Sequence, residues 1–317
     1  MAGGKNPSHI WVDGELKHWD DATIHISELG WSTVGGVFEG IKAYWNEKEG
    51  ELYVFRLREH LERLHRSMRL TRLPIHYSVD ELTDAVTGLL RACDATGDTY
   101  IFPMGFQKDS FNDRWNMLEQ SSRLLIHARP VPSHLFSDHV LNAGVSSWRR
   151  ISEDVMPPRI KNLSNYRNSQ LARMDALQGG YDTSILLNQA GKVSEAPGAC
   201  IVIVRDGKVI TPDFTQSVLE SITRDAVLKL AQEDLGLVVE ERAVDRTELY
   251  LADEAFICGT HAEITPVVSV DRFVLGDGHV GPITRQLEKE LDNAFRGHDG
   301  RRADWRTAVS MPAKVGA

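Results

Sequence analysis

Apolar and polar positions alternate with two different periods over the first hundred residues. Asp13-Gly14 lies between short apolar segments, and this dipeptide favours a two-residue hairpin turn. Apolar runs at 37–45 and 52–57, separated by a polar stretch, predict paired strands. From Leu57 to Met68 the apolar residues recur every three or four positions, which indicates an amphipathic helix. Ser78-Val79-Asp80-Glu81 then has the form of a capping box and predicts the start of a second helix.

The pattern changes near residue 129. Strands predicted at 100–106 and 124–128 complete a small α+β domain over residues 1–128. The next segment, Arg129-Pro130-Val131-Pro132-Ser133-His134, has two prolines within three positions, which disfavours a helix and suits an extended chain. We therefore expect a connector between domains at 129–139.

Beyond the connector, short apolar strands alternate with helices. We expect strands at 140–148, 183–187, 200–205, 209–211, 254–258 and 267–270. We expect helices at 168–177, 223–235 and 283–295, the last one ended by Gly297. These elements define a larger domain over 140–297, followed by a polar C-terminal tail at 298–317, in a protein of the α/β class.

Composition narrows the class of protein. A chain of 317 residues fits two domains, and 36 basic against 45 acidic side chains give a net charge of −9, which disfavours binding to nucleic acid. No apolar run approaches the roughly 20 residues that span a bilayer, so we expect a cytoplasmic protein with no membrane partner. Cys93, Cys200 and Cys258 lack metal-ligand spacing and lie among apolar residues, so we expect reduced thiols and no metal site.

Several short motifs mean little alone but occur together in a recognisable order. Lys161 is followed by Tyr166 five residues later, and Ser194-Glu195 follows further along. The matching stretches are Val37-Phe38-Glu39-Gly40-Ile41, Val54-Phe55-Arg56, Ser146-Ser147-Trp148, Ile222-Thr223-Arg224-Asp225-Ala226, Leu249-Tyr250-Leu251-Ala252-Asp253-Glu254, Ala262-Glu263-Ile264-Thr265-Pro266-Val267 and Gly281-Pro282-Ile283-Thr284. From about Ile10 to Phe295 the chain thus resembles the branched-chain aminotransferase family, the class IV (fold type IV) pyridoxal-phosphate enzymes. The resemblance implies a pseudo-barrel large domain and a homodimer.

The resemblance also implies pyridoxal 5'-phosphate as the cofactor and a role for three residues. Lys161 is the catalytic lysine, because the cofactor needs an amine that holds its aldehyde as a Schiff base and shuttles a proton. Glu195 is the carboxylate that keeps the ring nitrogen protonated, and Tyr166 is the hydrogen-bond donor to the phenolic oxygen. Lys42, Lys192 and Lys208 lack the downstream tyrosine at this spacing.

The remaining cofactor residues are expected to bind the phosphate. By resemblance, Arg56 supplies a guanidinium fork, and Ile222-Thr223 opens a helix whose free N–H groups attract an anion. Thr260 supplies a second hydroxyl, and Gly198 allows close approach of the backbone. The sequence has no Walker-type nucleotide loop.

The substrate side departs from the family. Phe38 and Tyr100 are retained, but Phe102 stands where the bacterial pattern has the arginine that serves the distal carboxylate of glutamate. The tyrosine expected ahead of the Phe38-Glu39-Gly40 run is Thr33 here, or lies in a shifted loop, and Val131 replaces the tryptophan of the connector. These changes predict a larger and more apolar pocket, and therefore a bulkier or less usual substrate.

Two histidines also differ from the family. His134 replaces the connector tyrosine, and Thr260-His261 replaces the Thr-Ala turn that binds the α-carboxylate. Ala199-Cys200 stands in place of a Glu-Asn pair. The histidines could act as pocket acids or cationic anchors, or could simply face the solvent.

The function implied is a PLP-dependent aminotransferase that moves an amino group from an amino acid to a 2-oxo acid by a ping-pong mechanism. The amino acid would be branched-chain-like, apolar or non-standard. The alternatives on the same fold are an (R)-amine or D-amino-acid transaminase and an aminodeoxychorismate-type lyase. A non-catalytic binding protein on this scaffold is a further alternative, although Lys161, Tyr166, Glu195 and Arg56 are all present.

Overall fold

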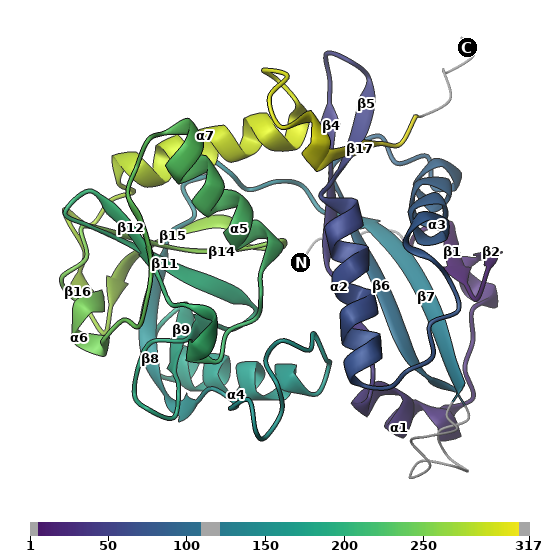
Figure 1. Ribbon diagram of the computed structural model, residues 1–317, viewed down its shortest axis with the longest axis horizontal. Coiled ribbons are helices and arrows are strands. Elements are labelled where there is room, and N and C mark those ends of the chain that lie inside the picture. The colour runs from purple at the N-terminus through teal and green to yellow at the C-terminus, as the bar shows by residue number, and fades with distance from the viewer. Residues whose placement is uncertain (1–5, 109–120, 311–317) are drawn as a thin grey trace. The chain divides into compact units, whose positions relative to one another are not determined.

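The computed structural model describes residues 6–108 and 121–310. The chain divides into two compact units (Figure 1). Unit 1 comprises Met1–Ser133, Ile160–Ser164 and Asn293–Ala317, and unit 2 comprises His134–Arg159 and Asn165–Asp292. The chain therefore enters unit 1 three times, and the five residues around Lys161 belong to it.

Unit 1 is built on an 8-stranded antiparallel sheet with the order β17-β5-β4-β6-β7-β1-β2, and β3 pairs with β6. Its strands are β1 His9–Val12, β2 Glu15–His18, β3 Val37–Phe38, β4 Ile41–Asn46, β5 Glu51–Phe55, β6 Thr99–Lys108, β7 Ser121–Pro130 and β17 Arg306–Ala308. Its helices are η1 Trp19–Asp21, η2 Ile26–Glu28, α1 Leu29–Val34, α2 Leu57–Leu70, α3 Val79–Ala92 and η5 Ala303–Trp305. The predicted hairpin at Asp13-Gly14 is confirmed by the register of Val12 opposite Glu15.

Helices α2 and α3 cover one face of this sheet (Figure 1). Because side chains alternate along a strand, Ile101 of β6 and Ile126 of β7 point into the helix-covered core, while Phe102 and His127 belong to the opposite face. The predicted capping box is present, since Ser78 Oγ accepts the Glu81 N–H and the Glu81 side chain accepts the Ser78 N–H. The sheet face opposite α2 and α3 carries several of the predicted site residues.

Unit 2 is built on a 9-stranded mixed sheet with the order β13-β12-β11-β14-β15-β8-β9, where β10 pairs with β11 and β16 with β15. Its strands are β8 Leu141–Arg149, β9 Thr183–Leu187, β10 Glu195–Ala196, β11 Ala199–Arg205, β12 Lys208–Thr211, β13 Val239–Glu241, β14 Glu254–Gly259, β15 Glu263–Val270 and β16 Phe273–Val274. Its helices are α4 Asn165–Gln178, η3 Phe214–Gln216, α5 Ile222–Lys229, the π-helix η4 Leu230–Asp234 and α6 Arg246–Leu249. Helix α7, Pro282–Arg296, begins in unit 2 and ends in unit 1.

The predicted strands and helices of unit 2 are present, and the short elements β10, β13, β16, η3 and α6 were not predicted. The helix predicted at 223–235 is α5 continued by a π-helical turn, η4. The start of α7 is capped from a distant strand, because Glu254 accepts the N–H groups of Ile283 and Thr284. Among the described residues, no helix is long and apolar enough to cross a membrane.

The segment after Gly297 adds structure that the sequence pattern did not predict. Residues 306–308 form β17, which pairs antiparallel with β5, Arg306 opposite Phe55. The boundary between the two units falls after Ser133, within the predicted connector, and the segment from Asn293 onward belongs to unit 1. The predicted domain limits at residues 128, 139 and 297 stay predictions.

Candidate active site

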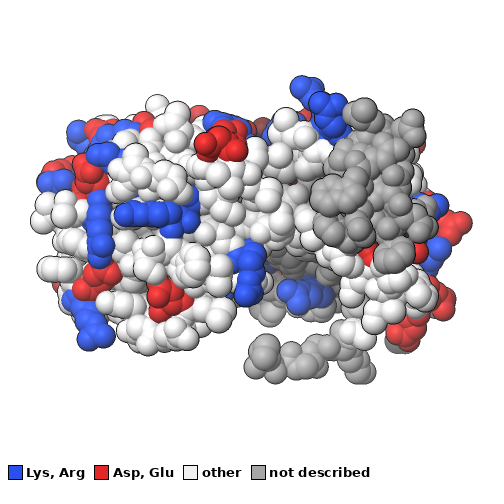
Figure 2. Space-filling view, turned by 90° about the horizontal axis from the view of Figure 1, so that it is seen from below, with Lys and Arg blue, Asp and Glu red and all other residues white. Residues whose placement is uncertain are grey.

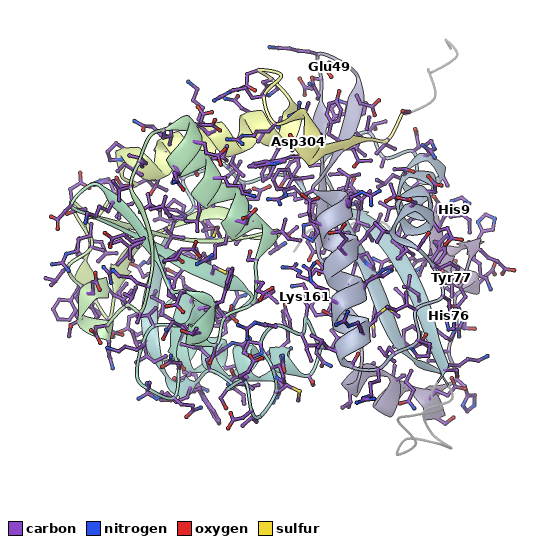
Figure 3. All side chains as sticks on the ribbon, in the orientation of Figure 1. His9, Glu49, His76, Tyr77, Lys161 and Asp304 are labelled. Atoms are coloured by element: carbon purple, nitrogen blue, oxygen red, sulfur yellow. The ribbon has the colours of Figure 1, made fainter. Side chains whose placement is uncertain are left out.

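Lys161 is fixed to unit 1 through its main chain. Its carbonyl oxygen accepts the Phe38 N–H at 3.0 Å, and its own N–H donates to Ser67 Oγ on α2 at 3.2 Å. The amine Nζ lies 4.8 Å from the centre of the Phe38 ring. Figure 3 labels Lys161 beside α2. The backbone of this lysine is therefore held from two sides, by β3 and by a helix.

A buried cluster of charged side chains, formed by Glu39, His60 and Arg63, lies next to the Lys161 segment. Glu39 is fully buried, and its carboxylate contacts Arg63 Nε at 2.7 Å and His60 Nδ1 at 2.8 Å. Burial opposes ionisation, but the charges and hydrogen bonds of Arg63 and His60 outweigh it and lower the pKa of Glu39 to about 2. Burial lowers the pKa of His60, and the nearby charge of Lys161 contributes in the same direction. The sequence analysis missed this cluster, although Glu39 lies within a matched stretch.

Arg56, the predicted phosphate ligand, has several contacts within unit 1. It adopts a left-handed backbone conformation (φ 47°) at the start of α2, and only 9% of it is exposed. Its Nε contacts Glu59 Oε1 at 2.6 Å, and its guanidinium lies 5.1 Å from the centre of the Trp305 ring. Arg63, two helical turns further on, lies on the α2 face that carries His60 and Ser67, next to the Lys161 segment.

The predicted substrate residues Phe38 and Phe102 are in contact in unit 1. Their rings stack at 5.0 Å with an interplanar angle of 25°. Tyr100 lies two residues before Phe102, and a methyl group at Gly40 would meet its hydroxyl at 2.0 Å, so only glycine fits there. The Arg129 guanidinium lies 5.9 Å from the centre of the Tyr100 ring.

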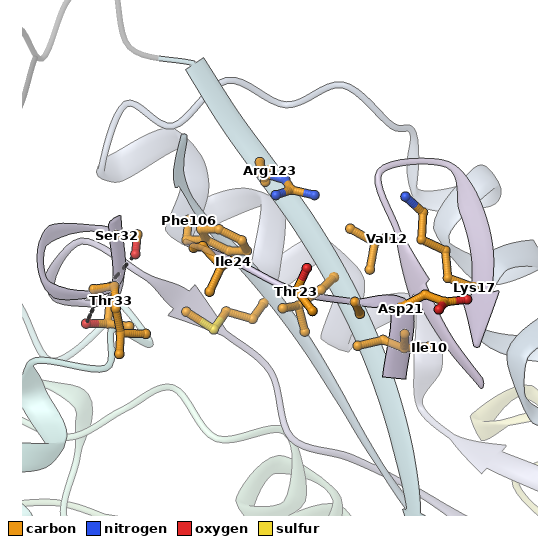
Figure 4. A pocket seen from close by; sticks show the side chains of 14 residues that line it. Ile10, Val12, Lys17, Asp21, Thr23, Ile24, Ser32, Thr33, Phe106 and Arg123 are labelled. Carbon is orange, nitrogen blue, oxygen red and sulfur yellow. Dashed lines mark hydrogen bonds between the residues drawn. The ribbon is translucent and has the colours of Figure 1, made fainter. Parts of the chain in front are cut away.

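Thr33 and Val131 also lie in unit 1. The Thr33 hydroxyl donates to the carbonyl oxygens of Leu29 and Gly30, at 3.0 and 2.9 Å. Thr33 lines a mainly apolar pocket of about 260 Å³ on the uncovered face of the sheet (Figure 4), with charged residues such as Arg123 also in its lining. Val131 is partly exposed, and its N–H donates to Asp98 O at 3.0 Å.

Glu195 is held by two donors in unit 2. It is 5% exposed, its Oε1 lies 2.8 Å from Arg150 Nη2, and its Oε2 accepts the Leu219 N–H at 3.1 Å. Each carboxylate oxygen has two acceptor positions, so capacity remains for a further donor. The sequence analysis missed Arg150, although it lies two residues after the matched Ser146-Ser147-Trp148.

Tyr166 and Gly198 are close neighbours in unit 2. Gly198 lies in the turn between β10 and β11 and has φ 78°, a conformation that favours glycine. A methyl group added there would lie 3.8 Å from Tyr166 Cε1. The missing side chain thus leaves backbone accessible beside the tyrosine ring.

The N-terminus of α5 carries Ile222 and Thr223, both buried. Ser221 Oγ caps the helix by accepting the Arg224 N–H at 3.2 Å. The first N–H groups of any α-helix have no intrahelical acceptor and favour an anion. Arg224 itself is structural, because its Nη2 donates to Pro212 O and to Glu241.

Thr260 and His261 form the turn between β14 and β15, where Gly259 pairs with Glu263. His134 binds to the end of this turn. Its Nε2 lies 2.8 Å from Ala262 O, and its Nδ1 lies 3.2 Å from the fully buried Glu263 carboxylate. His134 is therefore engaged with the protein through both ring nitrogens, whereas His261 is exposed.

The predicted site residues are thus distributed over both units. Those in unit 1 are Lys161, Arg56, Phe38, Tyr100, Phe102 and Val131. Those in unit 2 are Tyr166, Glu195, Gly198, Ile222, Thr223, Thr260, His134 and His261. On the face drawn in Figure 2, basic and acidic side chains of the described residues are interspersed among uncharged ones.

Comparison with known proteins identifies the family. Residues 36–270 match the amino-transferase class IV family. The probable branched-chain-amino-acid aminotransferase of Aquifex aeolicus is 39% identical, over 94% of this chain and 96% of that protein. The branched-chain-amino-acid aminotransferase of Escherichia coli K12 is 38% identical, over 97% and 99%. A crystal structure of the Thermobaculum terrenum branched-chain amino acid aminotransferase in its PLP form is 50% identical, with a TM-score of 0.93 over 96% of this chain and 99% of that one.

The chain belongs to the class IV aminotransferases. The predicted resemblance is confirmed, and so is the fold class, with an α+β unit and a pseudo-barrel unit of fold type IV. The prediction that the chain is an enzyme of the aminotransferase class is confirmed by the same comparisons.

Proposed function

We propose that this aminotransferase uses pyridoxal 5'-phosphate to move an amino group from an amino acid with an apolar side chain to a 2-oxo acid, by a ping-pong mechanism. The relatives named for branched-chain amino acids, and the solved relative in its PLP form, support this proposal. The alternatives, an (R)-amine or D-amino-acid transaminase and an aminodeoxychorismate-type lyase, are not favoured, because the relatives reported are named as branched-chain aminotransferases.

Three residues would hold the reactive part of the cofactor. When bound, pyridoxal phosphate supplies an electron sink for the carbon that loses its proton. Lys161 would hold the aldehyde and move the proton, and its fixed main chain suits that role. Glu195 would accept a hydrogen bond from the ring nitrogen, a role that its buried contact with Arg150 supports. Tyr166 would donate to the phenolic oxygen.

The phosphate would be bound by charge and by backbone donors. We assign Ile222 and Thr223 at the start of α5, the Thr260 hydroxyl and the accessible backbone at Gly198 to this role. Arg56 is the proposed guanidinium ligand. Arg63 is a second candidate, because it lies on the α2 face next to the Lys161 segment.

The substrate would be bound by a mainly apolar set of residues. Phe38 and Phe102 supply stacked rings, and Tyr100 and Val131 supply further surface. The turn at Thr260-His261 would bind the α-carboxylate through backbone N–H groups. His134 would support this turn, since its ring contacts Ala262 and Glu263.

Two further assignments belong to this proposal. A homodimer is proposed from the family resemblance. A cytoplasmic location is proposed from the sequence and is compatible with the lack of a membrane-spanning helix among the described residues.

The observation that carries the proposal is that the main chain of Lys161 is hydrogen-bonded to Phe38 of β3 and to Ser67 of α2. Borohydride reduction of the protein reconstituted with pyridoxal phosphate, followed by peptide mapping, should label Lys161. Lys42 is the matched control, because it is buried and its Nζ donates to Pro132 O. The reconstituted enzyme should also change its absorbance when leucine is added. A label on another lysine would overturn the assignment.

A further inference from the structure

Phe102 lies directly opposite His127 across strands β6 and β7. Both side chains belong to the sheet face that α2 and α3 leave uncovered, and their rings stack at 5.1 Å with an interplanar angle of 25°. The residue that replaces the family's arginine thus has a flat partner on the neighbouring strand. The sequence analysis did not single out His127.

This stacked pair belongs to a longer row of rings. On one side Phe102 stacks on Phe38 at 5.0 Å, and the Phe38 ring lies 4.8 Å from Lys161 Nζ. On the other side His127 meets the edge of Trp19 at 5.9 Å and 89°. We call Phe38, Phe102, His127 and Trp19 the aromatic row. Phe38 is the ring next to the proposed catalytic amine, and Trp19 is the ring at the other end of the row.

The aromatic row is an uncharged surface at neutral pH. Burial, assisted by the positive charge of Arg129, lowers the pKa of His127 to about 4, so its imidazole is neutral. Phe102, His127 and Trp19 each remain partly exposed. An aromatic side chain would gain ring contacts in addition to apolar burial.

We propose that the aromatic row binds the substrate side chain and selects aromatic amino acids and 2-oxo acids over aliphatic ones, with His127 as a specificity-determining residue. The inference rests on the proposed function and specifies its substrate class. An aromatic pair contributes beyond its buried area by an amount equivalent to about two- to tenfold in affinity. An aliphatic side chain of similar size makes no such ring contact.

The test uses unreactive ligands, so that binding is measured apart from turnover. Titration calorimetry of the holoenzyme compares 3-phenylpropionate with 4-methylpentanoate. The wild type should bind the aromatic acid more tightly, and His127→Ala should reduce this preference by about two- to tenfold. His127→Phe keeps a flat ring and should restore the preference. His76→Ala is the matched control, because His76 is an exposed histidine of the same unit, labelled in Figure 3.

A second readout separates this inference from the proposed function. The absorbance change of the bound cofactor is followed with phenylalanine and with leucine as donors, and the wild type should favour phenylalanine. If neither these nor other amino donors change the absorbance, the proposed function fails, whatever the binding preference. If leucine reacts but His127→Ala weakens both acids equally, or His127→Phe does not restore the preference, the role of the aromatic row is overturned. Should His127→Ala not fold, Trp19→Leu tests the same surface from its far end.

Discussion

Ser67 Oγ accepts the main-chain N–H of Lys161 at 3.2 Å, although 94 residues separate them in sequence. Ser67 itself is 1% exposed. With the Phe38 N–H bonded to the carbonyl oxygen of Lys161, the helix and the strand fix the lysine Cα from two directions. The position of the amine is then decided by side-chain torsions alone.

Replacing Ser67 by alanine should therefore destabilise the protein measurably. The partly buried Lys161 N–H would lose its acceptor, which costs about 1 to 2 kcal/mol. Urea denaturation followed by fluorescence gives the free energy of unfolding. Ser27→Ala, at an exposed serine of the same unit, is the control. Equal stability of Ser67→Ala and the control would show that the hydrogen bond contributes nothing.

Glu195→Gln should lower the rate of amino transfer on the order of 10²-fold, because the charge facing the ring nitrogen is lost while the shape is kept. Stopped-flow absorbance with a saturating donor measures the rate. Glu220→Gln is a suitable control, since Glu220 forms a more exposed ion pair with Arg159. Near-wild-type turnover in Glu195→Gln would refute the proposed role.

Arg56→Ala should reduce the preference of the protein for pyridoxal phosphate over pyridoxal by tenfold or more, because a charge-assisted contact with the phosphate is lost. Cofactor binding can be followed by absorbance, with the exposed Arg58→Ala as control.

Arg63→Ala should instead destabilise the fold by about 3 kcal/mol, since it leaves Glu39 buried without its main partner. If Arg63→Ala loses the phosphate preference and Arg56→Ala retains it, the phosphate arginine is Arg63.

Phe102→Arg should raise activity with glutamate, because a guanidinium would stand where Phe102 now excludes a distal carboxylate. An ion pair of this kind can change kcat/KM by about 10²-fold. The same change breaks the stacks with Phe38 and His127, so activity with apolar donors should fall. Phe102→Leu, which removes the ring without adding charge, is the control. The idea fails if glutamate is already the best donor and Phe102→Arg leaves that preference untouched.

Acid should destabilise the protein partly through His127. Its pKa is 6.5 in the reference state and about 4 in the fold, so the folded protein binds fewer protons than the unfolded chain between these values. The stability is fully present above pH 6.5 and is lost as the pH falls through 4. At pH 4.5 the loss from this group is about 2 kcal/mol. His127→Phe should lose less stability than the wild type between pH 7 and 4.5.

The fold was predicted from regular patterns of apolar and polar residues and from local capping motifs. The β6 and β7 strands, helix α2 and the Ser78 capping box were all readable, because their signals lie within a few neighbouring residues. The pairing of β17 with β5 was not, since it joins residues about 250 positions apart and β17 has only 3 residues. The cap that Glu254 provides for α7 is non-local in the same way.

The candidate site shows the same division. Lys161, Glu195 and Tyr166 were found because their types and spacing match a family, which needs no spatial information. Arg150 was missed because its role comes from a contact with a strand 45 residues away. His127 was missed for a similar reason: only the register between two strands places it opposite Phe102.

The place of β17 in the first sheet also has a consequence for synthesis of the chain. Residues 306–308 form the outer strand next to β5, so the sheet of unit 1 lacks one strand until these residues have been synthesised. The five residues around Lys161 likewise join unit 1 only after its main part has emerged. Unit 1 therefore cannot complete its folding as an N-terminal domain ahead of the rest, as domains commonly do during translation. A nascent chain released before residue 306 would carry an exposed β5 edge, which is open to aggregation until β17 has been made.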